Sequence, residues 1–308
     1  MSATAGSRTV AVVVTWNAAD MIGGCLRSIP ATVDVVVVDN ASADGTRAVL
    51  RDEFPGVHVV ANESNTGFTA GANRGLKEVV RADYALLLNP DARLQPGALE
   101  ALVGFLDAHP RAATCSALVI DDSGHPEPGS AGPEPTLLRV AFHELGLTPL
   151  THRLSAARAR SRTEPVKRDW VAGTCVLLRV EALRAVGDFD ESFFLYCEDI
   201  DWCRRAREAG WEVWLVPAAK AVHARSASVR TAGAWVDEHR IGSLDRYFAR
   251  HHGRASVWCF RVLRMIGKAA RAVGFGVAGR VLRRPEWVAR ARQRRQDTRL
   301  AAARLRRH

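Results

Sequence analysis

Cysteine is scarce in this chain, and none of the six cysteines belongs to a recognisable metal or redox pattern. There is no CxxC pair and no cluster of His and Cys at the spacing that zinc sites use. This argues against a zinc module and against a disulfide framework, and it predicts buried thiols in a reducing compartment. The cysteines are Cys25, Cys115, Cys175, Cys197, Cys203 and Cys259.

The sequence also lacks a long hydrophobic run near its start. The apolar stretch from Val10 to Trp16 is only about seven residues long and runs directly into polar sequence, too short for a membrane span or a signal-peptide core. We therefore expect synthesis in the cytosol without export. With 308 residues, of which 47% are hydrophobic and 25% charged, the chain can form one large α/β domain and a smaller appendage.

Acidic residues are scarce in the last part of the chain. From Arg250 to His308 there are 17 Lys and Arg against two acids, Glu286 and Asp297. The rest of the chain carries 26 Lys and Arg against 31 Asp and Glu. The tail therefore has a net charge of +15 and the rest −5, which together give the +10 of the whole chain. This segregation predicts that the tail meets a polyanion, either lipid headgroups or nucleic acid, while the body does separate work.

The basic tail has a helical pattern that begins near Val257. Apolar residues fall on one side and cations on a neighbouring stripe, as in a helix that lies in a membrane interface. Four cations within its first fifteen residues exclude a membrane span. The alternative is a solvated or partner-bound basic arm. The apolar side holds Val262, Met265, Ile266 and Ala269, and the stripe holds Arg261, Arg264, Lys268 and Arg271.

Apolar β-branched runs alternate with helical patterns over the first hundred residues, which predicts a parallel sheet with crossover helices. The Pro- and Gly-rich stretch 121–135 predicts a loop, and the chain from about Trp235 onward is helical in pattern. The predicted strands are Val10–Trp16, Val33–Val38, Val57–Ala61, Tyr84–Leu88, Ala112–Ala117, Trp170–Val180 and Trp211–Val216. The predicted helices are Asp20–Ile29, Gly45–Phe54, Thr69–Arg81, Pro96–His109, Glu181–Ala185 and Ile200–Ala209.

Polar residues follow three of the predicted strands, where open α/β sheets bind their ligands. Asp39 comes directly after four valines and is placed to accept hydrogen bonds from a ribose or base, although such an Asp equally suits a turn. Asp91 ends the strand YALLLNPDA. One carboxylate there, with phosphate oxygens and water, would suffice to bind a divalent cation on a diphosphate; the alternative is a helix-capping residue before Pro96.

Two further segments carry candidate residues. Gly67, Gly71 and Gly75 recur at four-residue spacing at a helix start, which fits either close helix packing or the approach of a phosphate or nucleoside. Glu198, Asp199 and Asp201 follow an aromatic run at the start of another helix. Helix capping explains part of this acidic cluster, but a carboxylate in a partly apolar pocket also has a raised pKa, suited to general base catalysis.

Six motifs stand in a specific order and spacing. They are TWN at 15–17, VDNASADGT at 38–46, NTGFTAGANRG at 65–75, LLNPDA at 87–92, GTCVLLR at 173–179 and FFLYCEDIDWCRR at 193–205. Together they resemble the family 2 glycosyltransferases, in particular the rhamnosyltransferase-like branch that builds bacterial cell-surface polysaccharides. The resemblance implies an α/β GT-A fold over residues 1–230, with a mostly parallel sheet, and a membrane-associating helical extension over 231–308.

The resemblance also implies roles for individual residues. Asp199 would be the base that deprotonates the acceptor hydroxyl, and Glu198 would orient that base or the acceptor. Asp91 would be the remaining carboxylate of the DxD motif, here NPD, and would bind Mg²⁺ or Mn²⁺ together with His223. The donor would contact Thr15, Asn17, Asp39, Asn40, Gly67, Phe68, Asn73, Asn89, Gly173 and Thr174.

The implied reaction inverts the configuration of a sugar, such as rhamnose, as it passes from a dTDP-, UDP- or GDP-sugar to a glycan or lipid-linked acceptor. We expect a cytoplasmic enzyme, peripheral on the inner face of the plasma membrane, with no nucleic-acid partner. One rival is a Rossmann-like oxidoreductase, disfavoured because GxGxxG is missing after the first strand. Another is a nucleic-acid-binding protein, disfavoured because the basic tail lacks interleaved aromatics.

Overall fold

The computed structural model describes residues 8–79, 81–144, 164–224 and 233–281. The chain divides into two compact units. The first consists of Met1–Glu134 and Ala159–Ser243, and the second of Pro135–Arg158 and Leu244–His308. The boundary predicted between residues 230 and 231 lies outside the described residues.

The described part of the first unit is built on a nine-stranded sheet with the order β3-β2-β1-β4-β10-β6-β11-β5, and β8 pairs with β11. Strands β3, β2, β1 and β4 are parallel, as predicted, whereas β10 is antiparallel to both of its neighbours. The bounds are β1 Thr9–Thr15, β2 Asp34–Asp39, β3 His58–Ala61, β4 Tyr84–Leu88, β5 Ala92–Leu94, β6 Ala112–Ile120, β8 Val166–Lys167, β10 Cys175–Arg179 and β11 Glu212–His223. A separate pair joins β7 (Ala131–Gly132) to β9 (Trp170–Val171).

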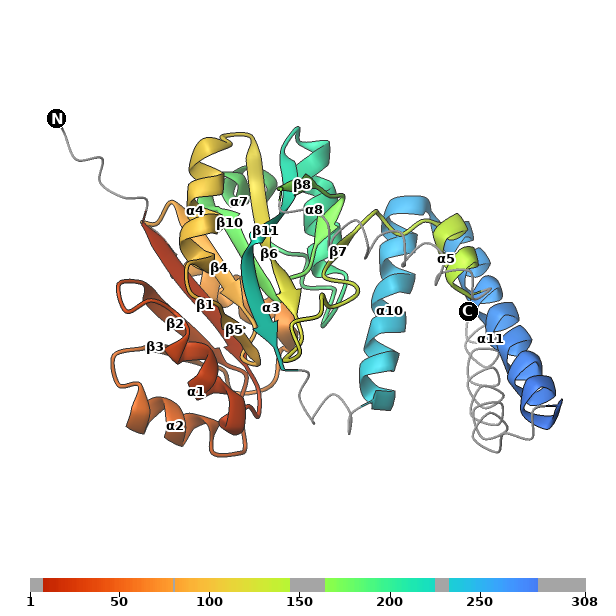
Figure 1. Ribbon diagram of the computed structural model, residues 1–308, viewed down its shortest axis with the longest axis horizontal. Coiled ribbons are helices and arrows are strands. Elements are labelled where there is room, and N and C mark those ends of the chain that lie inside the picture. The colour runs from red at the N-terminus through yellow and green to blue at the C-terminus, as the bar shows by residue number, and fades with distance from the viewer. Residues whose placement is uncertain (1–7, 80, 145–163, 225–232, 282–308) are drawn as a thin grey trace. The chain divides into compact units, whose positions relative to one another are not determined.

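Helices cover both faces of this sheet (Figure 1). On one face Ile22, Leu50 and Leu102 pack in a single buried cluster, and on the other Ala72, Ala182 and Trp202 do the same. The first face is covered by α1 (Ala19–Arg27), α2 (Thr46–Glu53) and α4 (Ala98–Ala108), and the second by α3 (Gly67–Lys77), α7 (Val180–Val186) and α8 (Glu198–Glu208). The α/β expectation is therefore confirmed.

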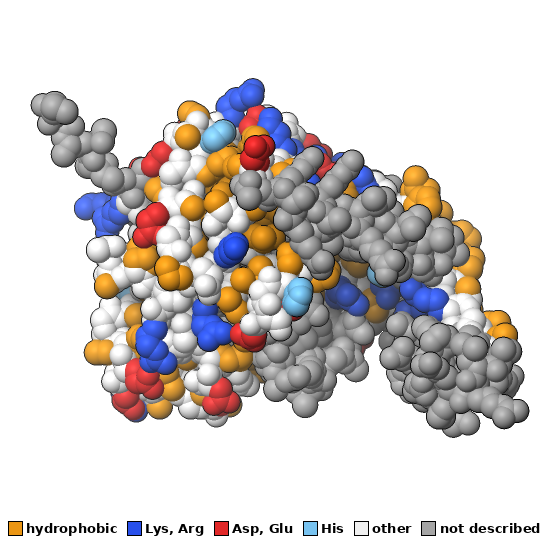
Figure 2. Space-filling model, viewed as in Figure 1, with side chains coloured by type: hydrophobic (Ala, Val, Ile, Leu, Met, Phe, Trp, Pro, Cys, Tyr) orange, Lys and Arg blue, Asp and Glu red, His pale blue; other side chains and the backbone are white. Residues whose placement is uncertain are grey.

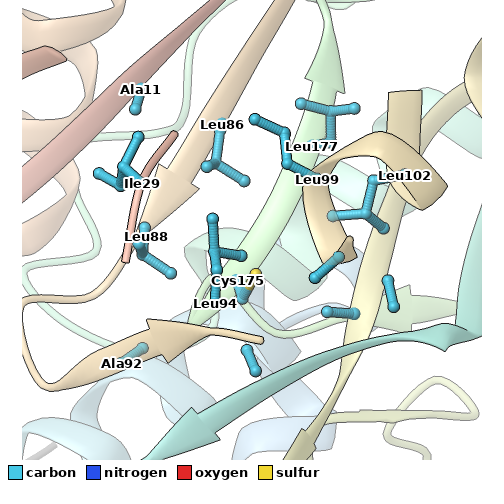
Figure 3. Packing of buried hydrophobic residues seen from close by; sticks show 14 of the residues in the cluster. Ala11, Ile29, Leu86, Leu88, Ala92, Leu94, Leu99, Leu102, Cys175 and Leu177 are labelled. Carbon is cyan, nitrogen blue, oxygen red and sulfur yellow. The ribbon is translucent and has the colours of Figure 1, made fainter. Parts of the chain in front are cut away.

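Strand β4, at the centre of the sheet, is buried on both faces and is apolar at every position. Leu86 and Leu88 of β4 pack in the first cluster, whereas Ala85 and Leu87 pack in the second. Figure 3 shows the first cluster, with Leu86 beside Leu177 of β10 and with Leu99 and Leu102 of α4 close by. Because both faces of β4 are packed, the end of the strand at Leu88 is fixed, and with it the position of Asn89 and Asp91, which follow.

Two predicted strands differ from the structure. The predicted strand Trp170–Val180 is two strands in different sheets: the Ala172 amide still donates to the Ser130 carbonyl beside the β7–β9 pair, but the next amide, that of Gly173, donates to the Asp199 carboxylate. The last core strand does not end at Val216: a register shift between Val216 and Lys220 accommodates Pro217, and β11 continues to His223. The stretch 121–135, predicted as a loop, contains β7.

The second unit is helical, as the pattern of the tail predicted. It holds α5 (Leu137–Glu144), α11 (Arg254–Val281) and the end of α10 (Gly233–His252). Tyr247, Phe248 and Phe260 are almost fully buried, and the rings of Phe248 and Phe260 stack 4.9 Å apart. Arg261, predicted on the exposed polar stripe, is instead largely buried and ion-paired with Asp245 at 3.0 Å.

Close packing of α3 on the sheet accounts for two of its glycines. A Cβ added at Gly75 would lie 2.4 Å from Val12 Cγ1, and one at Gly71 would lie 2.7 Å from Val14 Cγ1. Of the two alternatives for this glycine spacing, helix packing is therefore confirmed at Gly71 and Gly75. Gly67 differs, because its φ is +88° and its Cβ would meet the Phe194 carbonyl at 2.5 Å.

We expect Gly75→Ala to destabilise the protein by about 1–3 kcal/mol, because the methyl group overlaps two valine side chains of the sheet. The matched control is Gly104→Ala in α4, where nothing lies within 4 Å of the new methyl group. There the loss of helix-interior glycine should stabilise by up to about 1 kcal/mol. Urea unfolding monitored by circular dichroism measures both; equal midpoints for the two variants would contradict the packing argument.

Candidate active site

The register of β5 on β11 brings Asp91 and His223 together. Ala92 pairs with His223 across the two antiparallel strands, and the amide of Ala224 donates to the Asp91 carbonyl at 3.0 Å. As a result, His223 Nε2 lies 3.2 Å from Asp91 Oδ1, and both side chains are largely buried. The predicted metal-binding pair is therefore adjacent in space, although 132 positions separate the two residues in the sequence.

A third residue, Glu127, contacts His223 from the other side. Its Oε2 lies 2.7 Å from His223 Nδ1, in the stretch that the sequence predicted only as a loop. Burial lowers the pKa of His223, but the hydrogen bonds to Asp91 and Glu127 outweigh it and raise the pKa to about 9. Glu127 was missed because a lone acid between two prolines carries no periodic signal.

The donor set at this position suits a hard or borderline divalent cation. Asp91 offers a carboxylate oxygen and His223 an imidazole nitrogen, which Mn²⁺ accepts and which leaves positions for phosphate oxygens and water. Among the described residues no group of three or more His, Cys, Asp and Glu side chains is arranged to hold a metal by itself. An ion at this position would therefore need ligands from a substrate, as an open catalytic site requires.

The predicted base lies at the start of α8. Asp199 Oδ1 accepts the Ile200 amide at 2.8 Å and Oδ2 accepts the Gly173 amide at 3.2 Å. Burial raises the pKa of Asp199 to about 6, and these hydrogen bonds only partly offset it. The helix begins after Tyr196 and Cys197, which both have positive φ, an uncommon backbone for such side chains that turns the chain sharply into the helix.

The other acids of this cluster have different environments. Glu198 is buried, its Oε2 has no hydrogen-bond partner, and burial together with the adjacent Asp199 raises its pKa well above the usual range. Asp201 is fully buried and ion-paired with Arg205 at 2.8 Å, one turn further along the helix. The sequence grouped three acids, but the structure separates a structural acid from a pair of poorly solvated carboxyls.

The chain between Gly173 and Cys175 links the predicted base, Asp199, to the end of β4, which Asp91 follows. The Thr174 carbonyl accepts the amide of Asn89 at 2.9 Å, and Cys175 pairs with Leu88 across β10 and β4. The preceding amide, that of Gly173, is the one that donates to Asp199. A small cavity of about 10 Å³ beside Gly173 is lined by Glu198, Asp199 and Phe68, with room for about one water molecule. Asp91 does not line it.

The predicted nucleoside-side residues lie at the ends of β1 and β2. Asp39 pairs with Thr15 in the sheet, is fully buried, and is ion-paired with Arg47, which the sequence did not single out. Thr15 is buried and its Oγ1 has no hydrogen-bond partner. Asn17 has a φ of 52°, and its Oδ1 accepts the Ala43 amide at 2.8 Å, which joins the turns that follow the two strands.

Two of the residues predicted to contact the donor form hydrogen bonds within the fold. Asn40 donates to the Gly67 carbonyl at 2.9 Å and accepts from Asn62. Asn73 is buried in α3, where its amide bonds both the carbonyl and the amide of Phe189 at 2.9 and 3.0 Å. These side chains connect α3 to the strand end and to the segment before α8, and their contact with the donor stays a prediction. The amide of Phe68 donates to the Phe194 carbonyl, so α3 also contacts the aromatic run.

The protein family of this chain follows from its match to a known family model. Residues 10–187 match the family model described as glycosyl transferase family 2. The chain belongs to this family. The resemblance drawn from the six motifs is thereby confirmed, and the protein is a glycosyltransferase.

Relatives of this glycosyltransferase carry related activities in their names. It is 31% identical over 236 residues to the N-acetylglucosaminyl-diphospho-decaprenol L-rhamnosyltransferase of Mycobacterium tuberculosis, covering 72% of this chain and 76% of that one. It is 28% identical to the rhamnosyltransferase WbbL of Escherichia coli over 54% of this chain and 62% of that one. The rhamnosyltransferase-like branch is therefore supported by relatives as well as by motifs.

The fold of the glycosyltransferase is also found in solved structures. A mannosyltransferase from Pyrobaculum calidifontis, solved with GDP-Man and Mn²⁺, matches with a TM-score of 0.60 at 18% identity. The match covers 97% of this chain and 85% of that one. At this identity the likeness establishes the GT-A fold and not the ligands. The family model ends before Glu198, Asp199 and His223, so the roles of these three residues stay predictions.

Proposed function

We propose that this enzyme is a metal-dependent, inverting glycosyltransferase that transfers a sugar from a nucleoside diphosphate donor to a lipid-linked glycan acceptor. The observation that carries the proposal is the poorly solvated Asp199, joined through Gly173 and Thr174 to Asn89, which follows β4 and stands two positions before Asp91. Base and diphosphate-binding residues must be held in fixed relation for an in-line displacement, because misplacement of reacting groups is costly. That backbone link supplies such a connection.

The chemistry that the residues support is a single displacement. Asp199 accepts the proton of the acceptor hydroxyl as its oxygen attacks the anomeric carbon, while the bond to the nucleoside diphosphate breaks on the opposite side. The configuration at that carbon inverts, and no covalent bond to the protein forms. The two backbone amides on Asp199 fix the direction of the carboxylate. Glu198, with its raised pKa, is suited to donate a hydrogen bond from a neutral carboxyl.

Asp91 and His223 are the residues that would hold the divalent cation. When bound, such a cation neutralises charge that develops on a leaving diphosphate. Asn89 would contribute an amide to the donor side. The uncharged Asn makes the carboxylate of Asp91 the principal negative charge of the NPD segment, so we assign metal affinity chiefly to that residue.

We infer that the donor is an activated deoxysugar such as a rhamnosyl nucleotide, with dTDP, UDP and GDP as the nucleotides to test. Support comes from the names of the two relatives above, one of which also names a diphospho-decaprenol acceptor. The donor contacts proposed from this structure are Thr15, Asn17, Asp39, Gly67, Phe68, Asn89, Gly173 and Thr174.

A nucleotide-release assay tests the proposed function. The full chain is incubated with a panel of UDP-, GDP- and dTDP-sugars and a lipid-linked N-acetylglucosaminyl diphosphate acceptor, each with Mg²⁺, Mn²⁺ or a chelator. We expect release that depends on a divalent ion and on both substrates, and a product of inverted anomeric configuration by NMR. A product of retained configuration would contradict the assignment of Asp199 as a base.

The second unit supports a proposal about location. Large apolar side chains are exposed at Trp258, Ile266, Val273 and Val277 on one face of α11, and Figure 2 shows hydrophobic side chains along this helix with Lys and Arg beside them. No described helix is long and apolar enough to cross a bilayer. We propose that α11 lies in the interface of an anionic membrane, on the cytoplasmic side. There, burial of its apolar side chains and attraction of its Lys and Arg to anionic lipids both strengthen binding.

We expect Ile266→Asp to weaken binding to anionic vesicles by about tenfold or more, because burial of an Ile side chain contributes about 1.5–3 kcal/mol. The measurement is co-sedimentation of the full chain with phosphatidylcholine vesicles that contain phosphatidylglycerol. Val59→Asp places the same charge at an exposed apolar site on β3 and should bind like wild type. Unchanged binding of Ile266→Asp, or stronger binding to DNA than to vesicles, would contradict the proposal.

A further inference from the structure

The described residues place a carboxylate at each nitrogen of the His223 ring. Nε2 is 3.2 Å from Asp91 Oδ1, and Nδ1 is 2.7 Å from Glu127 Oε2. All three side chains are at most 15% exposed, so the contacts are shielded from water. A neutral imidazole carries one N–H and one lone pair, and the partner of one nitrogen decides what the other can bind.

The backbone around Glu127 holds its carboxylate in place. The amide of Glu127 donates to the Val119 carbonyl of β6 at 2.9 Å, and Pro126 forms a bridge with Ile120. The carbonyl of Glu127 in turn accepts a hydrogen bond from the Ser130 hydroxyl at 2.9 Å. Glu127 is therefore positioned by the central sheet, and its side chain reaches His223 from a fixed backbone.

The segment that follows Glu127 is attached to the helix of the proposed base. The Ser130 carbonyl accepts the Ala172 amide at 2.8 Å, directly before the glycine that contacts Asp199. Further on, Glu134 forms ion pairs with Arg204 and Arg207 of α8, the latter at 2.8 Å. Residues 127–134 therefore connect the His223 side of the site to the Asp199 side.

We propose that Glu127 is a positioning residue. Its carboxylate accepts a hydrogen bond from the Nδ1–H of His223, so that the lone pair on Nε2 faces the divalent cation beside Asp91. This inference rests on the proposed metal-dependent function and adds a residue that lies outside all six motifs. A carboxylate on the distal nitrogen fixes the tautomer and orientation of a ligating histidine and increases its basicity. Without that acceptor the ring can rotate and can protonate the nitrogen that should bind the cation.

Mn²⁺ binding by the full chain tests this role without reference to turnover. Free Mn²⁺ is titrated by electron paramagnetic resonance, alone and with UDP, GDP or dTDP, for wild type, Glu127→Ala and Glu127→Gln. We expect Glu127→Ala to lose about 10–100-fold in Mn²⁺ affinity. Glu127→Gln keeps a weaker, neutral acceptor and should fall between Glu127→Ala and wild type. The matched control is Asp122→Asn, an exposed acid of the same stretch that contacts Arg93 and not His223.

A spectroscopic signature separates positioning from a merely structural role. Pulsed electron paramagnetic resonance of bound Mn²⁺ should detect hyperfine coupling to an imidazole nitrogen in wild type and in Asp122→Asn. This coupling should be absent in His223→Ala and weaker in Glu127→Ala. Wild-type affinity and nitrogen coupling in Glu127→Ala overturn the proposal. If that variant does not fold, the same wild-type result in Glu127→Gln overturns it. Absence of Mn²⁺ binding by wild type removes the metal from the proposed function as well, whereas failure of the nucleotide-release panel alone leaves the Mn²⁺ result standing.

Discussion

Asp199→Asn is expected to lower kcat by about 10²–10⁴-fold, the contribution of a positioned general base, with little change in donor KM. The asparagine keeps the size of the side chain and one acceptor oxygen but cannot take the acceptor proton. Steady-state rates from the nucleotide-release assay, at saturating divalent ion and varied donor, give both parameters. The matched control is Glu208→Gln, an exposed acid of the same helix, which should retain wild-type kcat.

The pH profile gives an independent measure of the same role. Burial raises the pKa of Asp199 to about 6, and only the deprotonated carboxylate can act as a base. For wild type, kcat/KM should therefore fall about tenfold per pH unit below about 6 and level off above it, because the active form is lost as pH decreases. The residual rate of Asp199→Asn should lack this acidic limb.

Asp199 accepts two backbone amides, and asparagine can satisfy only one of them. The variant therefore leaves a poorly solvated N–H without a partner, at a cost of about 1–3 kcal/mol, and its unfolding must be measured beside its rate. A folded Asp199→Asn enzyme with wild-type turnover would remove the base assignment. A wild-type acidic limb retained in that variant would assign the titration to another group.

The local pattern of the chain was sufficient to predict the first half of the fold. The strand that ends at Leu88 is apolar at every position because both of its faces are buried, and that signal is present in the sequence itself. Asp39 and Asp91 could be proposed as site residues for the same reason, since each follows such a strand. The side-chain amides of Asn40 and Asn73 also bond to distant backbone carbonyls, and no local pattern of the sequence predicts such bonds.

The remainder depends on contacts that are remote in sequence. Strand β10 enters the sheet antiparallel between β4 and β6, and the amide of Gly173, shortly before it, donates to Asp199. The last core strand is predicted to end at Val216, but a local irregularity carries β11 past Pro217 to His223. Glu127 became visible only because β6 and β11 pair in parallel and bring the stretch after Ile120 beside the end of β11.

Asp91→Ala is expected to lower kcat/KM by about 10³-fold, because charge stabilisation by a bound divalent ion contributes several kcal/mol in such reactions. The change removes the one carboxylate of the NPD segment and leaves His223 with Glu127 alone. Two measurements check this: turnover as a function of Mn²⁺ concentration, and binding of the nucleoside diphosphate product with and without Mn²⁺. In wild type a chelator should abolish turnover and weaken product binding, whereas in Asp91→Ala it should change little.

The ion dependence distinguishes this role from a structural one. Loss of the contact with His223 alone would lower stability and activity at every Mn²⁺ concentration, whereas loss of a metal ligand shifts the concentration that gives half-maximal rate. Glu100→Gln, an exposed acid on α4, removes one negative charge from the same unit and should keep the wild-type Mn²⁺ dependence. A folded Asp91→Ala enzyme that requires the same Mn²⁺ concentration as wild type would exclude Asp91 as a ligand. The cation would then have to be held by other groups on the donor side of the sheet.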